Sequence, residues 1–115
     1  MKLDRTNYTA IYNRGNYYSG DTIPGMAIRL EDDSLFDEIR VLHPLRVETY
    51  IQLETNKLFI NNEIREDGFV VIEPIDSEIT KNLTPGRYEY FVKYEMRNGS
   101  IKTYVTGYFK ILRSK

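Results

Sequence analysis

The sequence predicts an all-β domain in which two antiparallel sheets pack face to face. Short apolar segments recur at intervals of about ten residues and are separated by turn residues such as Gly, Pro, Asn and Asp. Ile, Val, Thr, Tyr and Phe dominate, whereas alanine occurs only at positions 10 and 27, a balance that favours pleated sheet over helix. Because no segment predicts a helix longer than one turn, the pattern indicates an immunoglobulin-like two-sheet sandwich of about seven strands, with a small barrel as the alternative.

The carboxyl-terminal third predicts a long β-hairpin. Asn98-Gly99 favours a two-residue type I′ turn, because both central positions need a positive φ that Asn tolerates and Gly adopts freely. Counting outward gives the register, in which Tyr90 covers the gap opposite Gly107. The other expected core-face pairs are Met96–Ile101, Tyr94–Thr103, Val92–Val105 and Tyr88–Phe109, and the expected outer-face pairs are Glu95–Lys102, Lys93–Tyr104, Phe91–Thr106 and Glu89–Tyr108.

Residues 1–25 are rich in Asn, Tyr, Thr and Gly and show no sustained periodicity, so we interpret them as an amino-terminal arm. A first strand folded against the domain is the alternative, because Tyr8, Ala10 and Tyr12 alternate with their neighbours before a turn. Residues 26–115 are expected to form the sandwich.

Within the sandwich, residues 45–54 show the cleanest period of two, with the odd-numbered positions inward and Tyr50 on the wet face. One helical turn is expected after residue 75, with Asp76 or Ser77 as its cap and Ile79 and Leu83 on the same side. Further strands are predicted at residues 26–30, 58–60 and 69–72.

Charge and composition exclude several classes of function. The 16 basic and 17 acidic side chains leave a net charge of −1, which gives no overall attraction to nucleic acid or to an anionic membrane. No apolar run approaches the roughly 20 residues that cross a bilayer, and the first eight residues lack the apolar centre of a secretion signal. The absence of cysteine excludes a disulfide framework and a thiolate metal site. We expect neither a nucleic-acid nor a membrane partner.

No pattern in the sequence predicts catalysis. His43 is the single histidine, and it lies beside Pro44 with no motif that makes a nucleophile–base pair. The acidic stretch 31–38 lacks the spacing and central Gly of an EF-hand, which favours a solvated loop over a calcium site. Strand carboxylates such as Glu48 and Glu89 are expected to face lysines and water. We therefore expect a non-enzymatic protein with no cofactor and no metal.

The ten tyrosines exceed what one core of this size requires. Tyrosine is favoured where one end of the ring is buried and the other is wet, so the surplus suggests contact surfaces for a partner protein or for sugar rings. The alternative is that the second sheet or the arm covers these rings. The candidate contact residues are Tyr8, Tyr12, Tyr17, Tyr18, Tyr50, Phe91, Tyr104 and Tyr108.

The order of features from residue 19 onward resembles a known family. Gly-Asp-Thr at 20–22 precedes a strand, and Leu-Thr-Pro-Gly-Arg-Tyr-Glu-Tyr at 83–90 precedes a hairpin that closes in Gly-Tyr-Phe-Lys-Ile at 107–111. This pattern resembles the immunoglobulin-like sandwiches of tailed-phage structural proteins, above all the amino-terminal domain of baseplate upper proteins and head fibres. The likeness covers residues 19–112. Because no stalk or receptor-binding domain follows Lys115 in this sequence, a stand-alone decoration, auxiliary capsid or connector protein is expected.

The resemblance implies a non-enzymatic virion component, made in the cytoplasm of the bacterial host, that acts by protein–protein assembly. Its partners are then other virion proteins and copies of itself, with residues 1–25 as the anchoring arm. The main alternative is a carbohydrate-binding module in which Tyr50, Tyr104 and Tyr108 stack on sugar rings. A host-encoded chaperone or periplasmic adaptor is a third possibility, disfavoured by the missing signal.

Overall fold

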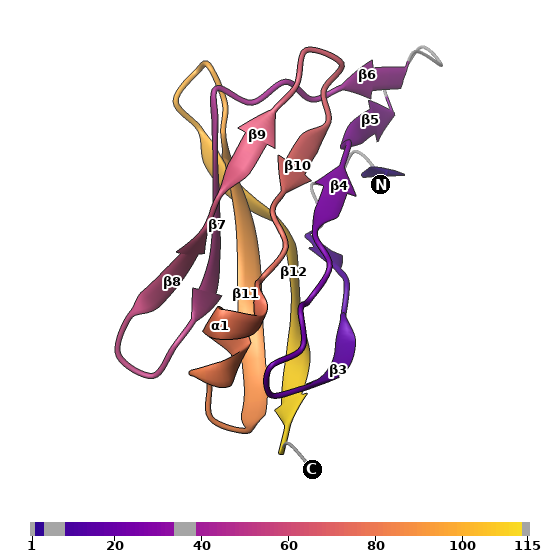
Figure 1. The fold of residues 1–115 in the computed structure, drawn as a ribbon. Coiled ribbons are helices and arrows are strands. Elements are labelled where there is room, and N and C mark those ends of the chain that lie inside the picture. The colour runs from indigo at the N-terminus through magenta and orange to yellow at the C-terminus, as the bar shows by residue number, and fades with distance from the viewer. Residues whose placement is uncertain (1, 4–8, 34–38, 114–115) are drawn as a thin grey trace.

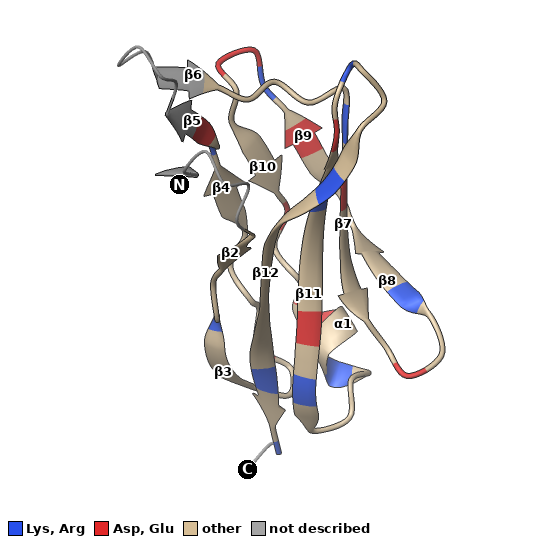
Figure 2. Ribbon diagram, turned by 180° about the vertical axis from the view of Figure 1, so that it is seen from behind, with Lys and Arg blue, Asp and Glu red and all other residues tan. Residues whose placement is uncertain are grey.

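Two sheets packed together form the body of the molecule, with the smaller sheet in front in Figure 1 and the larger sheet in front in Figure 2. The computed structural model describes residues 2–3, 9–33 and 39–113. The larger sheet has the strand order β2-β12-β11-β7-β8, with β3 also paired to β12, and the smaller sheet has the order β4-β10-β9. This arrangement confirms the predicted all-β, immunoglobulin-like sandwich. The strands are β2 (Ala10–Ile11), β3 (Gly15–Tyr18), β4 (Met26–Ile28), β7 (Arg46–Gln52), β8 (Lys57–Ile60), β9 (Asn62–Ile64), β10 (Val70–Ile72), β11 (Gly86–Glu95) and β12 (Ile101–Leu112).

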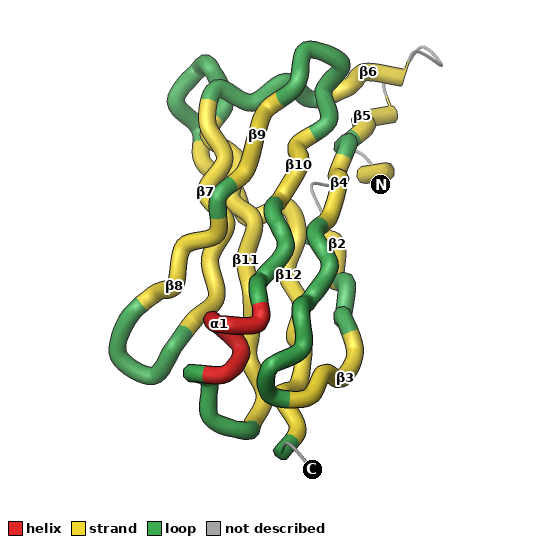
Figure 3. Tube along the Cα trace, viewed as in Figure 1, coloured by secondary structure: helices red, strands yellow, loops and turns green. Residues whose placement is uncertain are grey.

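A small third sheet continues from one end of the sandwich, beyond β4 (Figure 1). In it, β1 (Lys2–Leu3) pairs in parallel with β5 (Glu31–Asp33), and β5 pairs antiparallel with β6 (Ile39–Val41). At the opposite end of the sandwich lies the helix α1 (Ser77–Lys81), drawn in red in Figure 3. No helix in the three described ranges is long and apolar enough to cross a membrane.

The helical turn predicted after residue 75 is confirmed, and Asp76 is its cap. The Asp76 carboxylate accepts a hydrogen bond from the backbone N–H of Ile79 at 3.0 Å, which satisfies one of the free donors at a helix start. Within the helix, the buried Thr80 hydroxyl donates to the carbonyl of Asp21 at 2.7 Å. This bond ties α1 to the loop that follows β3.

The core lies between the two sheets and is lined by alternate residues of the facing strands. Complete burial of a large aliphatic or aromatic side chain contributes about 1.5–3 kcal/mol, so these positions fix which face of each strand points inward. The largest fully buried side chains are Tyr94, Phe109, Ile23, Leu30, Ile51, Ile111, Val70, Val92, Val105 and Thr80.

The base of the β11–β12 hairpin has the predicted register. Val92 lies opposite Val105, and Tyr88 lies opposite Phe109 with the two rings stacked at 5.7 Å between centroids. Because these pairs carry buried side chains, a one-residue slip would move them to the wrong face of the sheet.

The tip of the hairpin differs from the prediction. The N–H of Met96 donates to the carbonyl of Ser100 at 2.8 Å and Gly99 has a φ of 88°, so the loop has three residues rather than two. The extra loop residue shifts the pairing by one, and a bulge at Tyr104 restores the register before Val105. Four expected pairs are therefore wrong: Tyr94–Thr103, Lys93–Tyr104, Glu95–Lys102 and Met96–Ile101. The observed pairs are Lys93–Thr103, Tyr94–Lys102 and Glu95–Ile101.

The corner between α1 and β11 is closed by a tyrosine. The Tyr88 hydroxyl donates to the backbone carbonyl of Thr84 at 2.5 Å, four residues upstream. A tyrosine at the start of this strand that bonds back to the corner is a recurring feature of immunoglobulin-like sandwiches. The Leu-Thr-Pro-Gly-Arg-Tyr sequence at 83–88 thus has a structural role that this fold by itself explains.

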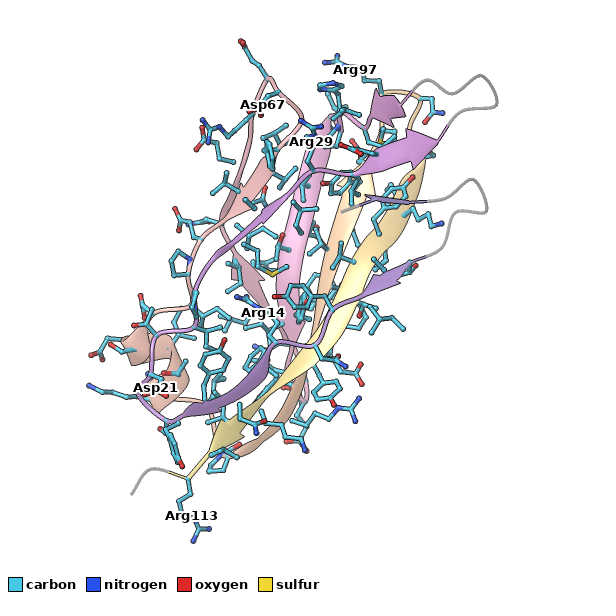
Figure 4. The ribbon with its side chains drawn as sticks, turned by 90° about the vertical axis from the view of Figure 1, so that its right-hand side faces the viewer. Arg14, Asp21, Arg29, Asp67, Arg97 and Arg113 are labelled. Atoms are coloured by element: carbon cyan, nitrogen blue, oxygen red, sulfur yellow. The ribbon has the colours of Figure 1, made fainter. Side chains whose placement is uncertain are left out.

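Residues 10–18 lie in the larger sheet, parallel to β12, and form one of its edges. The N–H of Tyr12 donates to the Thr106 carbonyl and the N–H of Arg14 donates to the Tyr108 carbonyl, each at 2.8 Å. The Arg14 guanidinium also donates to the carbonyl of Pro24, so the segment is held to the loop before β4 (Figure 4).

Gly107 allows this edge to approach β12 closely. A Cβ atom at position 107 would lie 2.0 Å from the carbonyl oxygen of Tyr12, a distance that no side chain permits. Tyr90 lies opposite Gly107, as predicted, and its hydroxyl donates to the same Tyr12 carbonyl. The glycine therefore serves the backbone of the neighbouring strand, and the tyrosine fills the space beside it.

Candidate functional site: the outer face of the larger sheet

A row of mainly apolar side chains crosses the outer face of the larger sheet, the face turned away from the smaller sheet. It contains one residue from each of five strands of this sheet, β3 excepted, and we call it the outer row. Cross-strand pairing links its members in the order Phe59, Tyr50, Phe91, Thr106 and Ile11, from β8 through β7, β11 and β12 to β2. In Figure 2 the charged segments of β11 and β12 lie above and below the middle of the sheet.

The outer row is covered in its middle and exposed at its ends. Tyr50 stacks on Phe91 with 5.2 Å between ring centroids and meets the edge of Phe59 at 6.0 Å. Tyr50 is only 4% exposed, whereas Phe59 is 59% exposed and Ile11 is 75% exposed. Large apolar side chains thus reach solvent at both edges of the sheet, on the same face.

The expectation that Tyr50 offers its ring to a partner is wrong. Its strand position faces outward as predicted, but the flanking rings cover its sides and two lysines cover its face. The Lys57 Nζ lies 4.5 Å from the ring centroid and the Lys93 Nζ lies 5.4 Å from it. A cation over an aromatic face is attracted to it, by about 0.5–1 kcal/mol at exposed sites. The cover comes from neighbours in the same sheet, not from the second sheet or the arm.

Tyr104 and Tyr108 lie in different environments. The bulge turns Tyr104 toward the core, where its ring meets the buried Tyr94 ring at 5.4 Å. Tyr108 stays on the outer face opposite Glu89, with the Arg87 guanidinium 3.9 Å from its ring centroid. Tyr50, Tyr104 and Tyr108 therefore do not form a flat exposed platform, and this arrangement does not favour stacking on sugar rings.

The tyrosines of the amino-terminal segment are divided between core and surface. Tyr17 is partly buried and packs against the core, whereas Tyr12 and Tyr18 are exposed along the edge beside β12. Tyr8 lies outside the described residues. Of the candidate contacts, the structure brings Tyr50, Phe91, Tyr108 and, at the β3 edge, Tyr18 onto one face.

A groove of about 610 Å³ lies beside the outer row, where β8 leaves the sheet. The chain crosses to β9 after Ile60, so β8 pairs only with the second half of β7. The side-chain amide of Asn62 donates to the Val47 carbonyl at 3.1 Å and to the Thr49 hydroxyl at 3.2 Å, which holds this stretch of β7 to the start of β9. The apolar lining on the outer face comes from Phe59 and Ile101.

Charged side chains surround this apolar lining. Arg46 Nε lies 3.1 Å from Glu95 Oε2 across the β7–β11 pair, and Glu48 and Lys93 lie opposite each other two pairs further along. Both signs of charge are present, so the groove has no net preference for an anion or a cation. Its position next to Phe59 makes it part of a mixed apolar and polar surface.

The residues that sequence analysis missed are Phe59, Ile11 and Ile101. A signal for Phe59 was present, because an alternating Lys-Leu-Phe-Ile strand places Phe on the face opposite Leu and Ile. Ile101 is 64% exposed on the outer face because the three-residue loop shifts the register, a change that the Asn-Gly pair does not reveal.

Two buried tyrosines have perturbed proton affinities, and neither suits catalysis. Burial raises the pKa of Tyr90 to about 12, and the nearby Arg14 charge opposes part of this effect. Burial also raises the pKa of Tyr94, to which the Tyr104 phenol adds. Both phenols stay protonated at neutral pH, so they offer no base and no nucleophile. The Tyr94 hydroxyl finds no hydrogen-bond partner within the described ranges.

Metal-binding chemistry has no support in the part of the chain that the structure describes. There, no three His, Asp or Glu side chains gather closely enough to hold an ion. The acidic stretch 31–38 lies mostly outside the described residues.

Comparison with known proteins gives little information about this chain. No protein-family model matches it, and no curated protein matches it. Among solved structures, an internalin-like protein of Listeria monocytogenes is similar at 10% identity and a TM-score of 0.42, over 98% of this chain and 30% of that protein. This chain therefore spans less than a third of the structure that it matches. A TM-score of this size carries no argument about fold or function.

Proposed function

We propose that this protein is a non-enzymatic structural component of a tailed-phage virion that acts by assembly with other virion proteins and with itself. The virion setting rests on the resemblance of residues 19–112 to the sandwich domains of baseplate upper proteins and head fibres. The observation that carries the assembly role is the outer row, which presents Phe59 and Ile11 to solvent on one face.

The composition of the outer face suits a protein–protein contact. Protein interfaces place aromatic and aliphatic side chains at the centre and charged groups at the rim. Here Phe59, Tyr50 and Phe91 form an aromatic cluster, in which Phe91 stacks on Tyr50, Phe59 packs against Tyr50 in a T-shaped arrangement, and Lys57 and Lys93 lie over the Tyr50 ring. A partner that covers Phe59 gains apolar burial without having to displace the lysines from Tyr50.

In this proposal the amino-terminal segment is a part of the larger sheet and not a free anchoring arm. Residues 10–18 are paired with β12 and bonded to the buried Tyr90, so they contribute an edge to the contact surface. Deletion of the segment would expose the edge of β12 and remove the packing of Tyr17. Point substitutions therefore test the proposal more cleanly than deletion.

The experiment that tests the proposal measures how much of the chain enters virions. Particles of a phage that encodes it are purified, and copies per particle are counted by quantitative mass spectrometry for the wild type, Phe59→Lys with Ile11→Lys, and Ile64→Lys. Ile64 is the matched control, because it is 38% exposed but belongs to β9 of the smaller sheet.

We expect wild-type chain at a fixed copy number per particle, at least a tenfold loss in the outer-row double variant, and no loss in the control. If the purified particles contain none of this chain, the proposed virion role is wrong. Equal losses in the control and the double variant would show that the outer row is not the contact.

A further inference from the structure

Two loops at the same end of the sandwich share one geometry; Asp67 and Arg97, labelled in Figure 4, belong to them. The loop of residues 65–69 joins β9 to β10, and the loop of residues 96–100 joins β11 to β12. In each loop the N–H of the first residue donates to the carbonyl of the fifth at 2.8 Å. The fourth residue is a glycine, Gly68 or Gly99, whose N–H donates back to the first carbonyl and whose φ is 89° or 88°. The loops are therefore a matched pair within one molecule.

The third residue of each loop has a side chain that bonds to the loop itself. The Asp67 carboxylate accepts a hydrogen bond from the N–H of Phe69 at 3.1 Å. Oδ1 of Asn98 accepts the equivalent bond from the N–H of Ser100 at 3.0 Å, and a second bond from the Ser100 hydroxyl at 2.7 Å. Both are Asx turns, in which a short polar side chain takes the place of a backbone carbonyl. Aspartate and asparagine thus serve the same position in the two loops.

Asn98 is the only asparagine in the sequence that is followed by glycine. Such an asparagine loses its side-chain amide without an enzyme, because glycine has no side chain to hinder attack by its backbone nitrogen. The Gly99 nitrogen gives up its proton and bonds to Cγ of Asn98, while the Cγ–Nδ2 bond breaks. Nδ2 takes up the proton and leaves as ammonia, and a five-membered succinimide remains. Water then adds to one of the two ring carbonyls and opens the ring to aspartate or to isoaspartate.

The surroundings of the glycine decide whether a folded loop can react, because ring closure requires the local backbone to rotate. Gly99 is exposed, and a Cβ atom built on it would meet no atom of the described residues within 4 Å, its chain neighbours aside. Gly68 is buried, and a Cβ atom built on it would lie 2.2 Å from Cγ1 of Val41. Rotation at Gly99 therefore opens a hydrogen bond at a hairpin tip, whereas rotation at Gly68 also has to displace a packed side chain.

We propose that Asn98 is a deamidation site of the folded protein. The proposal does not depend on the virion role, and water is the only other reactant. Asp67 shows that aspartate fits this position of the loop, so the aspartate product keeps the hairpin and adds one negative charge to its tip. The isoaspartate product places one more atom in the backbone between Met96 and Ser100, so their hydrogen bond is lost. The two products therefore have different effects on the hairpin.

The isoaspartate product affects the outer face of the larger sheet. Ile101 begins β12 directly after this loop and lines the groove beside the outer row. Because the Met96–Ser100 bond fixes the register at the tip, its loss frees Ile101 from its position. The share of chains changed in this way rises with the age of the protein.

The experiment compares Asn98 with the matched position in the variant Asp67→Asn. This variant has a second Asn-Gly pair, and it keeps a side-chain oxygen that can accept the Phe69 N–H. Wild type and variant are kept for weeks in mildly alkaline buffer, either folded or in urea. Peptide mass spectrometry with chromatographic separation measures aspartate and isoaspartate formed from asparagine at each position. Circular dichroism checks that the variant is folded.

In the folded variant we expect conversion at Asn98 to be at least about tenfold faster than at position 67, because Val41 packs on Gly68. In urea we expect similar rates, since both positions then precede an unrestrained glycine. If Asn98 reacts in urea but stays intact in the folded wild type, the loop protects it and the proposal is wrong. Equal rates at both positions of the folded variant would also overturn it, because packing around the glycine would then not select the site.

The effects of the two products are tested by hydrogen exchange at the Met96 amide. Asn98→Asp reproduces the aspartate product, and we expect its Met96 amide to exchange as slowly as that of the wild type. In the isolated isoaspartate form we expect exchange at least about tenfold faster, because the bond to the Ser100 carbonyl is lost. Unchanged exchange in the isoaspartate form would contradict the predicted opening of the hairpin tip.

Discussion

The two edges of the larger sheet are built in opposite ways. At the β2–β3 edge, backbone bonds, the Tyr90 hydroxyl and the glycine at 107 fix the segment to β12 and to the core. At the β8 edge, four residues pair with β7 alone and Phe59 reaches solvent. The comparison shows how one sheet combines an edge fixed to the core by several contacts with an edge held by one neighbouring strand.

The substitution with the largest expected effect on stability disrupts the edge formed by β2 and β3. Gly107→Ala places a Cβ 2.0 Å from the carbonyl oxygen and 2.6 Å from the carbonyl carbon of Tyr12, and backbone atoms move only at high cost. We expect a loss of about 3 kcal/mol in the free energy of unfolding, measured in urea. Lys110→Ala, an exposed change on the same strand, is the control and should lie within about 0.5 kcal/mol of wild type.

A smaller loss is expected when the hydroxyl that holds this edge is removed. Tyr90→Phe deletes the donor to the Tyr12 carbonyl and leaves that partly buried acceptor without it. The free energy of unfolding should fall by about 1.5 kcal/mol in the same urea measurement. Unchanged stability would mean that the hydrogen bond does not hold the edge.

The same tyrosine makes stability depend on alkaline pH. In the unfolded chain tyrosine ionises near pH 10, whereas burial raises the pKa of Tyr90 to about 12 in the folded protein. Between these values the folded state binds more protons than the unfolded state, so the contribution is present below pH 10 and is lost as the pH rises toward 12. Urea unfolding at a series of pH values should show this fall, with a shallower slope in Tyr90→Phe.

At the open edge, truncation should cost less. Phe59→Ala removes one edge-to-face contact with Tyr50, which we expect to lower the free energy of unfolding by about 1 kcal/mol. It should also uncover the Tyr50 ring. Because the chain has no tryptophan, acrylamide quenching of tyrosine fluorescence reports this change directly. Quenching equal to wild type would show that Phe59 does not shield Tyr50.

The smallest expected effect on stability is that of Tyr94→Phe, which should not destabilise the protein as Tyr90→Phe does. Tyr94 lies on the same strand as Tyr90 and is also buried, but its hydroxyl has no partner within the described ranges. Tyr94→Phe should therefore be neutral or raise the free energy of unfolding by less than about 1 kcal/mol. A loss as large as that of Tyr90→Phe would show that the Tyr94 hydroxyl has a hydrogen-bond partner.

The sequence predicted the fold well where side-chain alternation decides it. The strands at 45–54, 58–60 and 69–72 and the turn capped by Asp76 follow from local patterns, and all four appear in the structure. The base of the hairpin follows in the same way, because Val92, Val105 and Phe109 all have to be buried.

Other features depend on contacts that local patterns do not contain. Asn98-Gly99 favours a two-residue loop but also fits a three-residue loop that ends in a glycine of positive φ. The shift at Ile101 and the bulge at Tyr104 therefore follow from the whole hairpin. Tyr50 occupies a position with outward alternation, and its burial depends on Lys57 and Phe59, which are placed by the pairing with β8. The candidate site could therefore be located on the correct face but not described residue by residue.

The parallel pairing of residues 10–18 with β12 has a consequence for the order of folding. The Tyr108 amide that donates to Asn13 belongs to a pair separated by 95 positions in the chain. Contacts of such long range close late, because the entropy of ordering the intervening chain must be overcome first. On the ribosome, residues 10–18 are made long before their partner strand exists. Until β12 has emerged, the nascent sandwich lacks the strand with which this segment pairs, so we expect completion of the sheet to be a late event of its folding.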